Sequence, residues 1–228
     1  MLATLTGWLL GLLLGMRHAL EPDHLTAVST LVAENRSPRR GVLLGACWGV
    51  GHTVALLVVA VVLAALQAKM PERLADCFEL AVAFMLVFLG VRSLVRGARA
   101  GKLGVAHTHT HRFGAHTHRA PADHVHVGHW TFARRSLVVG LIHGLAGSGA
   151  LTVVVAAELP TTAARLAYIA LFGLGSVMGM AALSGIVGWP VARLARRPIV
   201  SRVFFLAAGA TSTVLGFFWA GPLLARIF

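Results

Sequence analysis

The chain has 228 residues, of which 57% are hydrophobic and 12% are charged, and its mean hydropathy is +0.78. These values lie far outside the range of soluble domains and indicate an integral membrane protein. The two cysteines, Cys47 and Cys77, form no CxxC motif, which excludes a disulfide scaffold and a thioredoxin-like dithiol. The net charge of +12 is not accompanied by a basic and aromatic platform, so we expect no nucleic-acid partner.

Six apolar stretches are long enough to cross ~30 Å of hydrocarbon, which takes about 20 helical residues. In chain order they cover residues 5–32, 41–68, 73–96, 135–158, 163–192 and 200–226. We therefore predict an all-α integral membrane protein with six transmembrane helices. Its parts are a first three-helix unit (1–98), a histidine-rich loop (99–134) and a second three-helix unit (135–228).

Basic residues gather on one side of the predicted membrane. Counting helix ends, the segments after the first, third and fifth helices carry fifteen Lys and Arg, whereas the opposite side carries four. Because loops on the cytoplasmic side are enriched in basic residues, we predict both termini outside and the 99–134 loop in the cytoplasm. The protein is expected in the cytoplasmic membrane, where its basic loops would also attract anionic lipid.

The two three-helix units resemble each other at offsets of 124 to 126 residues. The clearest matches pair Gly15, His18 and Leu20 in the first helix with Gly140, His143 and Leu145 in the fourth. Because each unit has an odd number of helices, the second must be inverted relative to the first. Inverted repeats are typical of secondary transporters, whose sites lie near the membrane midplane on interrupted helices.

Polar and helix-breaking residues interrupt the first predicted helix within eight positions. They are Arg17, His18, Glu21, Pro22, Asp23 and His24. Charged groups at this depth cost about 3 kcal/mol each and usually mark a pathway or a ligand site. Pro22 cannot donate to the carbonyl of His18, so the helix should kink or unwind and let these side chains converge. The alternative is structural: Arg17 and Glu21 form an ion pair along the helix, and the histidines only hydrogen-bond to neighbouring helices.

Two imidazoles with one carboxylate, from His18, His24 and Asp23, suit Ni²⁺, Co²⁺ or Zn²⁺ better than Mg²⁺ or Ca²⁺, which prefer oxygen ligands. His52, in the second predicted helix, is a further imidazole at membrane depth, and we predict it as a fourth ligand. Candidates for a metal or pathway role are also Glu21, His143 and Ser148.

The 99–134 loop is polar and contains eight histidines. They are His107, His109, His111, His116, His118, His124, His126 and His129. Histidine-rich tracts are typical of metal binding. We predict a flexible chelator that captures or buffers the cation, with a pH-responsive linker as the alternative.

The pattern His18-x4-Asp23-His24, followed by His52 within Gly51-His52-Thr53, resembles the signature of the nickel/cobalt transporter superfamily. With residues 140–148, the chain looks most like the short six-helix branch of urease accessory transporters. The resemblance implies Ni²⁺ or Co²⁺ as transported substrate, selected by His18, Asp23, His24 and His52. It also implies no enzyme activity, no catalytic cofactor, and nickel-enzyme maturation proteins as downstream partners.

A few residues bear on the direction of transport and on the alternative functions. Asp23 favours uptake by a secondary-type permease, whereas Leu20-Glu21-Pro22 is closer to the efflux branch, which commonly has Gly in place of Asp23. An intramembrane metalloprotease would need an HExxH motif, and a thiol-redox conduit would need paired cysteines in the first and fourth helices; the sequence has neither. A membrane metal sensor or structural protein that transports nothing remains the alternative from another class.

Overall fold

The computed structural model describes residues 2–33, 38–66, 68, 70–100, 106–111, 114–119, 129–146, 161–194 and 197–228. The helices in this part of the chain are α1 (Leu2–His18), α2 (Pro22–Ala33), α3 (Pro38–Leu66), α4 (Glu72–Ala100), α5 (His129–Gly144), α7 (Thr162–Leu194) and α8 (Pro198–Ile227). Two strands, β1 (Ala106–His111) and β2 (Gly114–Arg119), lie between α4 and α5.

Four of these helices are long and apolar enough to cross a membrane. The spans are Arg39–Leu63 in α3, Glu72–Arg99 in α4, Ala163–Val191 in α7 and Ile199–Ile227 in α8. The predicted span 5–32 is divided into α1 and α2, with 17 and 12 residues, and the predicted span 135–158 begins with α5, which ends at Gly144. The chain is thus a helical, multi-pass membrane protein, and its six spans remain a prediction.

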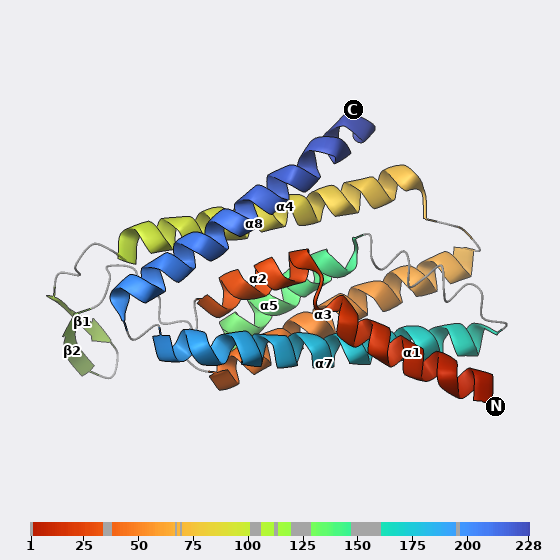
Figure 1. Cartoon of the computed structure of the whole chain (residues 1–228), viewed down its shortest axis with the longest axis horizontal. Coiled ribbons are helices and arrows are strands. Elements are labelled where there is room, and N and C mark those ends of the chain that lie inside the picture. The colour runs from red at the N-terminus through yellow and green to blue at the C-terminus, as the bar shows by residue number, and fades with distance from the viewer. Residues whose placement is uncertain are drawn as a thin grey trace.

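Helices far apart in the sequence pack side by side. α4 lies along α8, while α7 packs against both α1 and α3, and α3 also packs against α5. The short helix α2 lies between the α4–α8 pair and the α7 layer, and it contacts α4, α7 and α8 (Figure 1). In the same view both chain ends lie away from the β1–β2 hairpin. The centre of the bundle is therefore the place where α1 gives way to α2.

The outside of the bundle is apolar, as a lipid-facing surface must be. Large hydrophobic side chains are more than 60% exposed there, including Phe88, Ile186, Val214 and Phe218. In a soluble protein such a surface would promote aggregation, whereas in a bilayer it contacts lipid chains of the same polarity.

Glycines set the closest helix contacts around the centre of the bundle. A Cβ atom on Gly15 of α1 would collide with the Phe172 carbonyl in α7, and one on Gly140 of α5 would collide with the Trp48 carbonyl in α3. Small residues permit such close approach. Because lipid chains are as apolar as the helices, the hydrophobic effect does not drive helices together in a membrane, and close packing of this kind holds them instead. The hydroxyl of Ser136 adds a bond of 2.5 Å from α5 to a carbonyl of α3. These contacts fix the ends of α1 and α5, where His18 and His143 lie.

The predicted 99–134 loop contains regular structure that the sequence analysis did not anticipate. β1 and β2 are antiparallel, and their register places His107 opposite His118 and His109 opposite His116. The alternation of Thr with His explains this, because threonine is enriched in strands and the alternation matches the two-residue period of a strand. α4 extends to Ala100 and α5 begins at His129, while His124 and His126 lie outside the described residues.

Candidate metal centre

The candidate centre lies at the break between α1 and α2. α1 ends at His18 and α2 begins at Pro22, where a missing backbone N–H costs no hydrogen bond. The carbonyl of His18 accepts the amide N–H of Glu21 at 3.0 Å instead. In a straight helix His24 would point about 240° around the axis from His18, but across this break their ring centroids are 4.4 Å apart.

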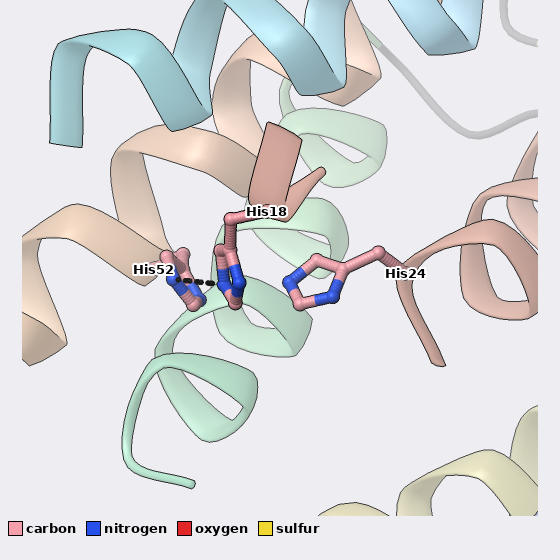
Figure 2. Close-up of side chains that lie close together, drawn as sticks. All are labelled: His18, His24 and His52. Carbon is pink, nitrogen blue, oxygen red and sulfur yellow. Dashed lines mark hydrogen bonds between the residues drawn. The ribbon is translucent and has the colours of Figure 1, made fainter. Parts of the chain in front are cut away.

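His18, His24 and His52 form one buried group of three imidazoles (Figure 2). Their exposed fractions are 5%, 0% and 0%, and their candidate ligand atoms lie within 4.8 Å of one another. The Nε2 atoms of His18 and His52 are 3.2 Å apart. With metal–nitrogen bonds of about 2.1 Å, this separation subtends about 100° at a shared ion, an angle that tetrahedral and octahedral sites both tolerate.

Asp23, His24 and His143 form a second buried group that shares His24 with the first. The Nε2–H of His143 donates to Oδ2 of Asp23 at 2.7 Å. The other carboxylate oxygen, Oδ1, accepts the backbone N–H of His24 at 2.8 Å and the Nδ1–H of its ring at 2.9 Å. Four imidazoles and one carboxylate therefore make one continuous cluster, to which α5 contributes His143.

The hydrogen bonds of Asp23 decide which ring nitrogens of its partners carry lone pairs. The carboxylate accepts Nδ1–H of His24 and Nε2–H of His143, so in the neutral form of each ring the opposite nitrogen carries the lone pair. Those two nitrogens, with Nδ1 of His52, are buried and have no hydrogen-bond partner. An unpartnered buried polar atom costs about 1–3 kcal/mol. A carboxylate that orients imidazoles in this way is the usual outer partner of metal-binding histidines.

The remaining predicted site residues have different positions. Oε1 of Glu21 lies 2.9 Å from Nδ1 of His18, and its side chain is 43% exposed, so Glu21 contacts the cluster from outside. Ser148 lies outside the described residues. The hairpin that carries His107 to His118 lies at one end of the molecule, away from the break between α1 and α2 near its middle (Figure 1).

Sequence reasoning missed the aromatic neighbours of the cluster, of which Trp48 is the most buried. The fully buried indole of Trp48 stacks on the ring of His24, with centroids 5.4 Å apart and an interplanar angle of 19°. The only signal for it in the sequence is its position four residues before His52, which places both on one face of a helix.

Membrane-length helices around a buried cluster of imidazoles and a carboxylate define a multi-pass membrane protein with a candidate transition-metal site. The chain is 32% identical over 213 residues to the urease accessory protein UreH of Bacillus sp. (strain TB-90), a match that covers 91% of this chain and 87% of that protein. It therefore belongs to the UreH family of urease accessory proteins, the branch of the nickel/cobalt transporter superfamily that its motifs resemble. Kinship with an accessory protein also confirms the prediction that the chain is not an enzyme.

A second relative is more distant. The chain is 27% identical over 194 residues to the chloroplast protein FOR GROWTH AND FERTILITY 1 of Arabidopsis thaliana; the match covers 82% of this chain and about half (52%) of that protein. No family model and no solved structure matches the chain.

Proposed function

We propose that the protein is a secondary-type permease that carries Ni²⁺ or Co²⁺ across the cytoplasmic membrane, in the direction of uptake. The observation that carries this proposal is the cluster of His18, Asp23, His24, His52 and His143, buried where α1 gives way to α2. Such groups are expensive inside a membrane protein and are found there when they serve a substrate or ion pathway.

The donor set favours a borderline transition metal. We propose His18, His24 and His52 as imidazole ligands, with Asp23 either ligating directly or holding His24 and His143 in place through its two oxygens. Imidazole ligands suit Ni²⁺ and Co²⁺, and the general order of affinities places Ni²⁺ above Co²⁺. Imidazole must be neutral to bind a metal, so protons compete with the cation and offer a route to coupling.

We further propose that units 1–98 and 135–228 are inverted repeats that move relative to each other during transport. Equivalent contacts support this: Gly15 lies against Phe172 as Gly140 lies against Trp48, at the offsets that the sequence predicts. The bond from His143 to Asp23 crosses between the two units inside the cluster. A relative movement of the units would therefore change the ligand set, as alternating access at a central site requires.

The β1–β2 hairpin has a separate part in this proposal. Its histidines, with those that follow it up to His129, would bind cations on the cytoplasmic side and pass them to maturation proteins of nickel enzymes. This assignment depends on termini outside and loop inside, which the distribution of basic residues predicts.

The proposal is tested by the ⁶³Ni²⁺ content of cells that express the wild type, His18→Ala, or the control Ser29→Ala. The Ser29 hydroxyl donates to the Leu25 carbonyl within α2 and makes no hydrogen bond to His18, Asp23 or His24 among the described residues. Higher accumulation in wild-type and Ser29→Ala cells than in His18→Ala cells supports uptake. Lower accumulation would show the efflux direction that Leu20-Glu21-Pro22 suggests. Equal accumulation, with all three proteins in the membrane, would reject transport of nickel and favour a sensor or structural role.

A further inference from the structure

A pocket of about 330 Å³ lies directly beside the metal cluster, between α4, α5, α8 and the turn that joins α1 to α2. Asp23 and His143 are 5% and 2% exposed and form its inner end. Arg226, near the end of α8 and with a side chain 59% exposed, lies at its outer end. The pocket thus leads from the surface to the cluster.

The pocket is acidic, although the chain as a whole is strongly basic. Three of the eight acidic residues in the chain line it, namely Glu21, Asp23 and Glu79. The charge of Arg226 is offset by Asp76, whose Oδ1 lies 3.3 Å from Nη2 of the arginine. Apolar walls, to which Phe218 contributes, weaken screening, and a cleft of one charge sign with such walls concentrates ions of the opposite sign.

A second, independent observation at the inner end points to a cation. His143 is one of the lining residues and is almost completely buried, and its Nδ1 is buried without a hydrogen-bond partner. Its Nε2 is already bonded to Asp23, so Nδ1 is the ring nitrogen left for a ligand. Glu21, on the same pocket, contacts the ring of His18 at 2.9 Å. The pocket is therefore lined by two members of the second buried group, and Glu21 connects it to the first.

We propose that this pocket is the route by which Ni²⁺ or Co²⁺ reaches the cluster from the side opposite the hairpin, and that Glu79 and Glu21 form an entry subsite for the hydrated cation. The inference rests on the proposed function and adds a residue, Glu79, that no motif in the sequence indicates. Carboxylate oxygens hold a hydrated divalent ion without stripping its water, and the imidazoles further in then replace that water. Glu79, two turns into α4, is half-buried, whereas Asp23 is only 5% exposed, so Glu79 lies nearer the surface and would meet the ion first.

The test measures how fast Ni²⁺ binds to the purified full-length protein in stopped flow, with tryptophan fluorescence as the signal. Trp48 stacks on His24, so Ni²⁺ bound in the cluster will quench it, and Trp48→Phe should lose most of the signal. Glu79→Gln is expected to lower the association rate about fivefold at low salt, with the quench amplitude retained. The difference should shrink at about 0.5 M KCl, where charges in contact with solvent are screened.

Two further variants keep this test falsifiable. Glu72→Gln, in the exposed first turn of the same helix, should bind Ni²⁺ at the wild-type rate. Glu79→Asp keeps the charge and should stay close to the wild type. A Glu79→Gln rate equal to that of Glu72→Gln would overturn the proposal. Equal slowing in Glu79→Gln and Glu79→Asp would also overturn it, because the cause would then be packing and not charge.

This measurement is separable from the test of transport because it needs no net movement across a membrane. Nickel transport in cells together with a normal association rate in Glu79→Gln would reject the entry subsite and leave the permease. An association rate that depends on Glu79 in a protein that moves no nickel would reject the permease and leave the subsite. Absence of any quench in the wild type would reject the subsite.

Discussion

Replacing His143 with alanine tests whether the second three-helix unit takes part in metal binding. His143 is 2% exposed and donates through Nε2 to the carboxylate of Asp23 at 2.7 Å. Alanine removes this donor and leaves Oδ2 of Asp23 buried without its partner. Asp23 then loses one of the contacts that hold it against His24, so the imidazole ligands lose their alignment.

The size of the effect follows from this hydrogen bond. A bond to a charged group contributes about 1.5–3 kcal/mol. At about 1.4 kcal/mol for each factor of ten, the Ni²⁺ affinity should fall about 10- to 150-fold. Loss of an outer partner of a metal ligand usually costs about 10- to 100-fold, which lies in the same range. His143→Gln should recover part of the affinity if His143 acts as a donor to Asp23, and none if its Nδ1 is a metal ligand.

The assay is calorimetric titration of Ni²⁺ into the purified protein, with ⁶³Ni²⁺ uptake measured in parallel. Ser136→Ala is the matched control, because Ser136 is also buried on α5 but bonds to the Leu44 carbonyl, away from the cluster. It should lower thermal stability and leave the Kd for Ni²⁺ within about threefold of the wild type. A Kd for His143→Ala that also lies within about threefold, in protein of normal abundance, would mean that His143 does not support the metal site.

Three other changes test the packing, the helix break and the hairpin. Gly15→Ala places a Cβ against a carbonyl of α7 and should destabilise the protein by about 1–3 kcal/mol, measured as a lower Tm in detergent. Gly7→Ala, on the same helix with nothing within 4 Å, should not, and equal Tm values would contradict this account of the packing. Pro22→Ala supplies an N–H for the His18 carbonyl and should weaken Ni²⁺ binding at least about tenfold by calorimetry, whereas an unchanged Kd would mean that tertiary contacts alone maintain the break. A Gly/Ser linker in place of 106–119 should raise the half-saturating Ni²⁺ concentration for uptake by less than about tenfold, and complete loss of uptake would relocate the transport site to the hairpin.

Local chemistry was readable from the sequence. Hydropathy identified a membrane protein because the cost of exposing polar groups to lipid depends on each residue almost independently of its partners. The types of residue between His18 and His24 indicated a transition metal, and Pro22 marked the place where one helix ends and the next begins. The motif also identified the family, which the match to UreH confirms.

Some expectations drawn from the sequence were too simple. Hydropathy alone joined residues 5–32 into one stretch, because it averages over a break of three residues, whereas Pro22 predicted the interruption that separates α1 from α2. The segment that forms the hairpin was expected to be a flexible loop, because no alternation of apolar residues indicated its strands. An alternating Thr and His pattern predicts a strand less strongly than an alternating apolar pattern does. The reason is that a strand without a buried face has little packing energy.

Only the tertiary structure decided which side chains meet. His52 and His143 come from α3 and α5, and they reach the break between α1 and α2 because glycines such as Gly15 and Gly140 let the helices approach to backbone contact. Glu79 lines the same pocket as Asp23 and His143 because α4 lies along α8, beside α2. Hydropathy and a missing N–H act over a few neighbouring residues, so the sequence displays them directly. A cluster built from residues more than a hundred positions apart depends on the summed packing of every helix between them, and no short stretch of sequence contains that information.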